Sequence, residues 1–330
     1  MNIQLNNNIN KKSRDLTLFL NSNYDGVFYT GHASILVRLN KKKYLFDYIN
    51  NTNFYRNSWI FFPNQIIDNR LFDVDGVFVS HIHQDHYDPR LLRKFQKKKI
   101  PIYILDGRPG FKDSLKKEKI KPRYIQVKKK TYINKETWVY GCLHEYNDID
   151  SSMLISNDKL SVYHGNDNFI TNKTLIPFKK NVGSIDVACI PFAYINYYPY
   201  LLNGISKKIN KSEATRIENL FMDYGIQQSR ILKPKIIIPF GSNLFHLDNP
   251  KCEMNRGVAT PSDFVNYAKK KDKSFYKNYK TMLSGSFLLK KDNKIELSYE
   301  EISQQEFNNE LIKFNIRKKK LLKKNKKIKK

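Results

Sequence analysis

Three of the seven histidines in this chain lie within six residues, and an aspartate stands among them: His81, His83, Asp85 and His86. They directly follow Val77-Phe78-Val79, an apolar run typical of a buried strand. Neutral imidazole and carboxylate supply the lone pairs that catalytic divalent metals bind. A loop leaving a strand can direct His81 and His83 at one ion, and Asp85 and His86 at a second. A histidine-rich surface turn is the alternative, but the spacing favours a metal site.

The chemistry of such a site is hydrolytic. A divalent ion with an open position lowers the pKa of its water to about 7 and polarises a carbonyl or phosphoryl oxygen. No Ser-His-Asp motif, glycine-rich phosphate loop or dinucleotide fingerprint competes for the role. We therefore predict a metal-dependent hydrolase of an ester, lactone, amide or phosphodiester, acting on a small-molecule or amphiphilic substrate.

The segments around the cluster predict a layered α/β domain. Strands alternate with helices in its second half, and the sequence shows no repeat period. Residues 90–97 predict a helix, and a second helix should open at Ser212 and stop at Pro234. The predicted strands are residues 27–29, 34–39, 44–48, 75–79, 100–105, 137–140, 160–163, 187–190 and 236–239.

The chain contains enough apolar material for one large core, since 40% of its 330 residues are hydrophobic. No linker rich in Pro, Gly or Ser divides it, so residues 1–310 predict one domain. No run approaches the roughly 18 apolar residues of a membrane helix, and Leu16 to Leu20 is too short for a signal peptide. The three cysteines lack C-x-x-C spacing and predict neither disulfides nor a zinc finger. We expect a cytoplasmic protein without a transmembrane segment.

The formal charge of +28 is unevenly distributed. Residues 311–330 hold eleven Lys and Arg and no acid, and the remaining positive charge is scattered in short clusters. This pattern favours a solvated surface and a flexible basic tail over a dedicated polyanion site. The tail nevertheless leaves nucleic acid or an anionic surface open as a partner.

The motif His81-x-His83-x-Asp85-His86 resembles the signature of the metallo-β-lactamase superfamily. That resemblance implies a four-layer αβ/βα sandwich with the metals at one edge. Gly31-His32-Ala33-Ser34 and Leu45-Phe46-Asp47 are similar to the opening of one branch of that superfamily. This branch contains ascorbate-6-phosphate lactonase, N-acyl-phosphatidylethanolamine phospholipase D and CMP-N-acetylneuraminate hydroxylase. The resemblance covers most of residues 25 to 255 and implies one or two zinc ions, with iron or manganese as alternatives.

The resemblance also implies ligands outside the motif. A histidine expected at a later strand end matches His144, with a hydrogen-bonded core histidine as the alternative. The aspartate that bridges both metals matches Asp167, with a turn aspartate as the alternative. The last family histidine is missing, because Gly241 stands two residues after Pro239 where that histidine is expected. His246 replaces it only if the intervening loop folds back.

Several residues receive supporting roles. Asp85 and Asp167 are expected to orient the nucleophile. His32 lies in the segment that the resemblance places at the metal mouth, which suggests a role toward the substrate or behind the metals, or a structural one. His164 is interpreted as orienting Asp167. Tyrosines of residues 194–200 are candidates for the pocket wall, and loop packing is the alternative.

Two other functions stay open. The first is a metal-dependent oxygenase resembling the nucleotide-sugar hydroxylase, which couples its metal site to a Rieske cluster held by Cys-x-His pairs. Only Cys142 has a histidine two residues later, His144, and a Rieske cluster needs two Cys and two His ligands, so such an oxygenase would need a separate electron donor. The second is a nuclease resembling tRNA-processing or β-CASP enzymes, although no place for the large β-CASP insertion is evident.

Overall fold

The computed structural model describes most of the chain between residues 15 and 298. The described residues are 15–50, 53–55, 59–61, 65–147, 149–195, 198–199, 202, 204–242, 244–246, 259–292, 294–298, 316 and 319. The predicted basic tail therefore lies outside the described residues except for Ile316 and Lys319. Tyr197, Tyr200 and Cys252 also lie outside them, whereas Cys142 and Cys189 are buried free thiols.

Eight strands form the first sheet, in the order β17-β16-β1-β2-β3-β6-β7-β8. Neighbours are antiparallel from β17 to β3 and parallel from β3 to β8. Asn40 and Lys41 both have positive φ in the tight turn between β2 and β3, as a two-residue hairpin requires. The strands are β1 (Asp25–Gly31), β2 (Ser34–Leu39), β3 (Lys42–Phe46), β6 (Gly76–Val79), β7 (Ile102–Leu105), β8 (Arg123–Ile125), β16 (Phe287–Lys291) and β17 (Lys294–Ser298).

The second sheet has six strands in the order β14-β13-β12-β11-β10-β9, parallel from β14 to β12 and antiparallel beyond. A small third sheet has the order β15-β5-β4. The strands of these two sheets are β9 (Thr131–Tyr132), β10 (Trp138–Leu143), β11 (Ser151–Ser156), β12 (Ser161–His164), β13 (Val187–Pro191), β14 (Ile236–Phe240), β4 (Asn53–Phe54), β5 (Trp59–Phe61) and β15 (Leu244–His246).

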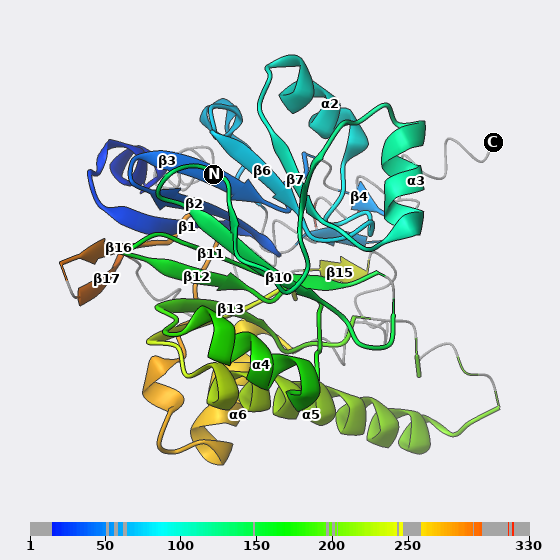
Figure 1. The fold of residues 1–330 in the computed structure, drawn as a ribbon. Coiled ribbons are helices and arrows are strands. Elements are labelled where there is room, and N and C mark those ends of the chain that lie inside the picture. The colour runs from blue at the N-terminus through cyan, green and yellow to red at the C-terminus, as the bar shows by residue number, and fades with distance from the viewer. Residues whose placement is uncertain are drawn as a thin grey trace.

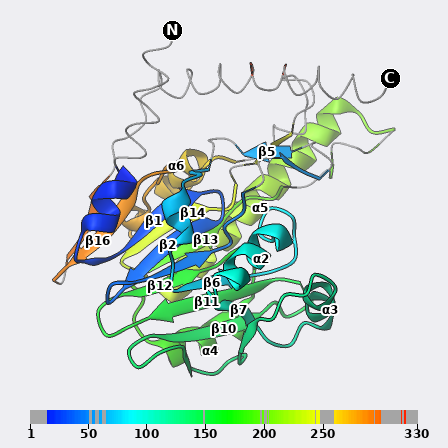
Figure 2. The same ribbon diagram turned by 90° about the horizontal axis from the view of Figure 1, so that it is seen from above.

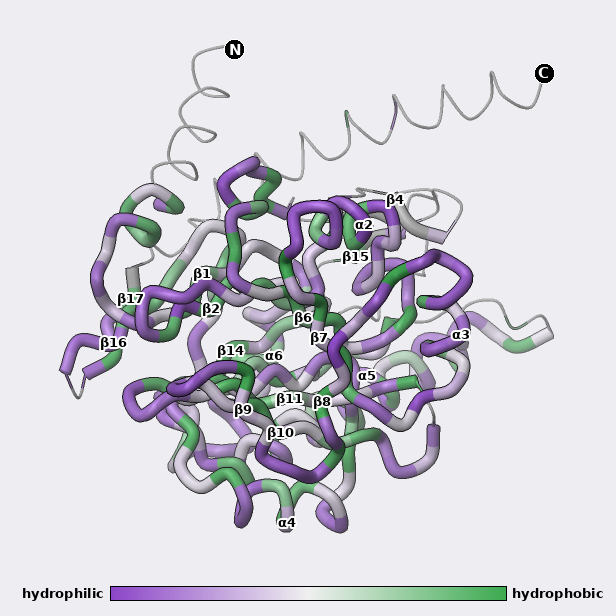
Figure 3. Tube along the Cα trace, turned by 45° about the horizontal axis from the view of Figure 1, so that its top comes forward, coloured by the Kyte–Doolittle hydropathy of each residue, from purple (hydrophilic) through white to green (hydrophobic). Residues whose placement is uncertain are grey.

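Helices cover the outer faces of the two large sheets (Figure 1). One apolar cluster fills the space between the sheets, and two others join each sheet to its own helices. The hydrophobic colour in Figure 3 follows the strands, while hydrophilic residues dominate the outer loops. The predicted four-layer αβ/βα sandwich is thus confirmed. Its helices are α2 (Pro89–Lys97), α3 (Pro109–Lys117), α4 (Asn172–Val182), α5 (Lys207–Leu232) and α6 (Pro261–Lys271), with 3₁₀ turns at Asn69–Phe72 and Tyr276–Asn278.

The helix predicted to open at Ser212 begins earlier. α5 starts at Lys207, because the side chain of Ser206 caps it by accepting from the backbone N–H of Ile209. Its end is as predicted, with Lys233 in the left-handed conformation just before Pro234. Figures 1 and 2 show α5 extending past the ends of the strands. Among the helices that the structure describes, none has the length and apolarity needed to cross a membrane.

Candidate metal centre

The histidine cluster occupies the loop between β6 and α2. Asp88 ends the loop by capping α2, and the backbone N–H of His86 donates to the carbonyl of His83 at 3.0 Å. This turn folds the four predicted ligands back on one another. His81 and His86 are buried, as is Asp85.

One group of ligand atoms joins this loop to the end of β12. His81, His83 and Asp167 each place a ligand atom within 4.8 Å of those of the other two. Nε2 of His81 lies 2.7 Å from Nδ1 of His83 and 3.7 Å from Oδ2 of Asp167. Burial and the nearby rings of His86 and His83 hold the pKa of His81 well below its ordinary value. His81 is therefore neutral, as a metal ligand must be.

A second group contains His32, Asp85 and His86, again within 4.8 Å. Oδ2 of Asp85 is 3.2 Å from Nε2 of His32 and 3.5 Å from Nε2 of His86. Oδ2 of Asp167 lies 3.3 Å from the same His86 nitrogen. Asp167 thus contacts both groups, which is the position that a bridging carboxylate needs.

Asp47 orients His86 from behind. Its Oδ2 lies 2.9 Å from Nδ1 of His86, and its carboxylate also accepts from the backbone N–H and hydroxyl of Ser80. Nε2 of His86 consequently points into the site, where it is buried and has no hydrogen-bond partner among the described residues. An orphaned buried nitrogen of this kind fits a metal ligand.

The charge balance of the cluster also fits a cation. Burial opposes a proton on His86, but the carboxylates of Asp167, Asp85 and Asp47 raise its pKa well above the ordinary value. Burial likewise opposes ionisation of Asp85, yet His86 and His32 hold its pKa below the usual range. The carboxylates therefore favour positive charge at this point, which a proton on His86 or a bound divalent ion would supply.

Asp150 was not predicted as a site residue. It immediately precedes β11, and its Oδ1 lies 3.8 Å from Nε2 of His81 and is buried without a hydrogen-bond partner among the described residues. Burial and the Asp167 carboxylate raise its pKa. In the sequence, Asp150 could have been identified by its position at the start of a strand, six residues after His144. Asp150 is a further candidate ligand beside His81.

His144 and His246 lie outside both groups of ligand atoms. His144 lines the adjacent cavity, where its Nδ1 accepts from the backbone N–H of Tyr146. His246 lies in β15 opposite Trp59, and the two rings are in edge contact at 4.9 Å. Both remain predicted ligands. His164 does not orient Asp167 as interpreted, because its Nε2 donates to the Ala33 carbonyl at 2.8 Å.

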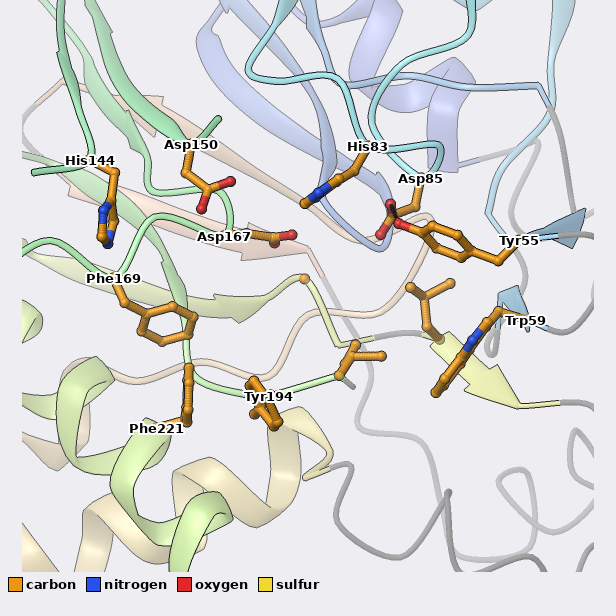
Figure 4. A pocket seen from close by; sticks show the side chains of 14 residues that line it. Tyr55, Trp59, His83, Asp85, His144, Asp150, Asp167, Phe169, Tyr194 and Phe221 are labelled. Carbon is orange, nitrogen blue, oxygen red and sulfur yellow. Dashed lines mark hydrogen bonds between the residues drawn. The ribbon is translucent and has the colours of Figure 1, made fainter. Parts of the chain in front are cut away.

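The ligand groups open onto a cavity of about 520 Å³. Figure 4 shows its polar side, formed by His83, Asp85, His144, Asp150 and Asp167. Phe169, Tyr194 and Phe221 lie across the cavity, and Tyr55 and Trp59 close one end. Of the candidate tyrosines, Tyr194 lines the pocket. Tyr198 is instead exposed and donates to Glu213 on α5.

Comparison with solved structures supports the fold. A metallo hydrolase from the archaeon Ignicoccus hospitalis, Igni18, matches 84% of this chain and 99% of its own at 13% identity and a TM-score of 0.53. CmlA, a diiron beta-hydroxylase from Streptomyces venezuelae, matches 78% of this chain at 15% identity, with a TM-score of 0.52 for a point variant. This chain spans about half of CmlA, 52%.

Sequence comparison identifies the family. A protein of Mycolicibacterium smegmatis, provisionally named a Rieske 2Fe-2S iron-sulfur protein, is 36% identical over 78 residues. The match spans only 23% of this chain and 15% of that protein. The beta-lactamase superfamily domain matches residues 26–216, more than half of the chain and all of the histidine cluster. The chain therefore belongs to the beta-lactamase superfamily and has the metallo-beta-lactamase fold.

Proposed function

We propose that this protein is a metal-dependent hydrolase that binds one or two zinc ions. The observation that carries the proposal is the meeting of two ligand groups, joined by Asp167, at the wall of a cavity. His81, His83 and Asp167 would hold one ion, with Asp150 and His144 beside it. Asp85, His86 and Asp167 would hold the other. When bound, such ions supply a water of lowered pKa and polarise a carbonyl or phosphoryl oxygen.

The chain's own groups supply positioning and proton handling. Asp85 is fixed from two sides, because Nε2 of His32 lies 3.2 Å from Oδ2 and the Tyr55 hydroxyl donates to Oδ1 at 3.1 Å. Asp150 faces the same cavity, and if it is not a metal ligand its raised pKa suits it to deliver a proton to a leaving group. Asp85 and Asp167 orient the nucleophile.

The cavity wall points to the kind of substrate. Aromatic rings of Phe169, Tyr194 and Phe221 lie opposite the polar groups, and Phe169 and Phe221 contact each other edge to face at 4.6 Å. A substrate that fits would place a polar, scissile group at the ligands and an apolar group on these rings. Esters, lactones, amides and phosphodiesters with an aromatic or acyl substituent meet this requirement.

A metal-dependent oxygenase is the second candidate. The ligand groups are rich in carboxylates, namely Asp85, Asp167 and the neighbouring Asp150, and histidine with carboxylate is a donor set that also suits iron. The similarity to the diiron CmlA agrees with this reading. Because the sequence contains a single Cys-x-His pair, Cys142-Leu143-His144, and not the two that a Rieske cluster needs, reducing electrons would come from a separate donor.

The test compares metals and reactions in one preparation. Metal-free protein is reloaded with zinc, manganese or ferrous iron, and turnover is followed on chromogenic esters, lactones, amides and phosphodiesters. We expect zinc to restore hydrolysis and Asp167→Ala to abolish it together with at least one bound ion, because that carboxylate contacts both ligand groups. Asp106→Asn, which changes an exposed aspartate paired with Lys112, is the matched control.

Other outcomes separate the candidates. Activity that requires iron, oxygen and an added reductant would favour the oxygenase. Failure of the wild-type chain to retain any metal would contradict both candidates. Full metal content and turnover in Asp167→Ala would show that a different carboxylate joins the two ions.

A further inference from the structure

The end of β14 borders the second ligand group, but the residue there is a glycine and offers no side chain. Gly241 follows this strand with φ +85, and a Cβ built on it would lie 3.6 Å from Oδ1 of Asp167. The position therefore borders the ligands but contributes nothing to them. Its backbone N–H donates instead to the carbonyl of His32 at 3.2 Å. The fold thus places the β1–β2 turn, which contains His32, against the end of β14, where Gly241 stands in place of a histidine.

Three separations between neighbouring ligand atoms match those expected around a tetrahedral ion. Metal–ligand bonds of about 2.0–2.1 Å at tetrahedral angles place neighbouring ligand atoms about 3.3–3.4 Å apart. The three measured separations are 3.2 Å from His32 to Asp85, 3.5 Å from Asp85 to His86 and 3.3 Å from His86 to Asp167. A hydrogen bond between His32 and Asp85 accounts for the first separation alone. Without a metal, the other two are ion-pair contacts of Nε2 of His86 with the carboxylates of Asp85 and Asp167, so the separations alone do not decide between the two accounts.

The backbone holds His32 in this place at a conformational cost. His32 has φ +51, a left-handed conformation that is uncommon for non-glycine residues. Its carbonyl accepts from the Tyr29 hydroxyl at 2.7 Å as well as from Gly241. Its buried ring lies against Phe61, with ring centroids 5.1 Å apart. The turn therefore presents the imidazole to Asp85 and His86 in a fixed orientation.

We propose that His32 is a ligand of the second metal ion. Together with Asp85 and His86 it forms a group whose ligand atoms lie within 4.8 Å of one another, beside Asp167 at 3.3 Å from His86, and it takes the place that Gly241 leaves without a side chain. The inference rests on the proposed metal site and adds a ligand to it. The alternative is that His32 only orients Asp85 through a hydrogen bond.

Two variants distinguish these roles. His32→Asn removes the imidazole, and asparagine tolerates the left-handed backbone. Tyr55→Phe removes the other hydrogen bond to the same Asp85 carboxylate but no candidate nitrogen ligand. Metal-free wild type and both variants are titrated with zinc, and bound ions per chain are measured by elemental analysis after gel filtration. Urea unfolding of the metal-free forms checks that each variant folds, and His32→Gly is the substitute if His32→Asn does not.

We expect two ions per chain in the wild type and in Tyr55→Phe. His32→Asn should retain one ion, with the dissociation constant of the second raised at least tenfold. Equal binding of two ions by both variants would overturn the assignment of His32 and leave the hydrolase proposal intact. A wild-type chain that binds one ion would also overturn the assignment, and one that binds none would contradict the proposed function itself.

Discussion

At the scale of single residues, Asp47 shows how a side chain outside the histidine cluster shapes it. Burial raises the cost of its charge, but hydrogen bonding to His86 and the charge of that ring hold the pKa of Asp47 below its usual range. The resulting carboxylate fixes which nitrogen of His86 carries the proton. The Ser80 hydroxyl acts similarly on His81, because its oxygen lies 3.0 Å from Nδ1 of His81 and can accept a hydrogen bond from it while donating to Asp47. Both ligand nitrogens are therefore aimed by residues behind them.

Asp47→Asn should weaken metal binding without unfolding the protein. The amide has the shape of the carboxylate but lacks its charge, so His86 loses its anionic partner. We expect metal affinity to fall about 10- to 100-fold, measured by competition with a chromogenic zinc chelator. Asp73→Asn is the control, because Asp73 pairs with Lys43 at the surface. Unchanged affinity in Asp47→Asn would show that the orientation of His86 comes from the loop alone.

At the scale of elements, Asp186 joins the two large sheets. It directly precedes β13, and its carboxylate lies 2.8 Å from Nζ of Lys235 and 2.9 Å from Nζ of Lys290. Lys290 belongs to β16 of the other sheet. The backbone N–H of Ser161 donates to the same carboxylate at 3.1 Å. Burial opposes ionisation, but these partners hold the pKa of Asp186 below its usual range.

Asp186→Asn should lower stability in a pH-dependent way. Because the folded-state pKa lies below the unfolded value of about 3.9, the ionised group stabilises the fold above that pH. Its contribution is lost as pH falls through the folded-state pKa. We expect the free energy of unfolding at pH 7 to fall by about 1–3 kcal/mol, with the difference from wild type narrowing below pH 4. Urea unfolding across this range would measure it, and a difference independent of pH would contradict the ionic explanation.

At the scale of the whole molecule, the excess of positive charge does not come from the residues of the metal site. The net charge is +28, yet acidic groups dominate the polar side of the cavity. Eleven of the positive charges belong to residues 311–330, beyond every candidate ligand. The composition therefore predicts that an anionic partner, if it binds residues 311–330, binds separately from the metal site.

Removal of residues 311–330 should leave turnover of a small substrate unchanged. The deletion takes away cations but no candidate ligand, so metal content should also stay the same. Binding to RNA, DNA or anionic vesicles should weaken and lose part of its salt dependence. Turnover of a small chromogenic substrate and binding at two salt concentrations would test both expectations. A large loss of turnover would show that the tail contributes to the site.

The sequence by itself determined the fold class and the centre of the site. His81, His83, Asp85 and His86 are close because a short loop after a strand leaves them no other arrangement. Strands such as Ser34–Leu39 and Val187–Pro191 were predictable from their apolar runs. The start of α5 was not, because Ser206 and Ser212 are both suitable caps and local sequence does not choose between them.

Only the tertiary structure decided which distant residues join the cluster. His32, Asp47 and Asp150 lie far from the motif in the chain, and each stands at the end of a strand or in a turn beside one. Their meeting depends on how the two sheets stack and on where the strand ends coincide. The periodicity of hydrophobic residues and the spacing of a motif do not specify how the strand ends of the two sheets align. That alignment arises from the packing of the apolar faces between the sheets. Gly241 and His32 are neighbours for the same reason.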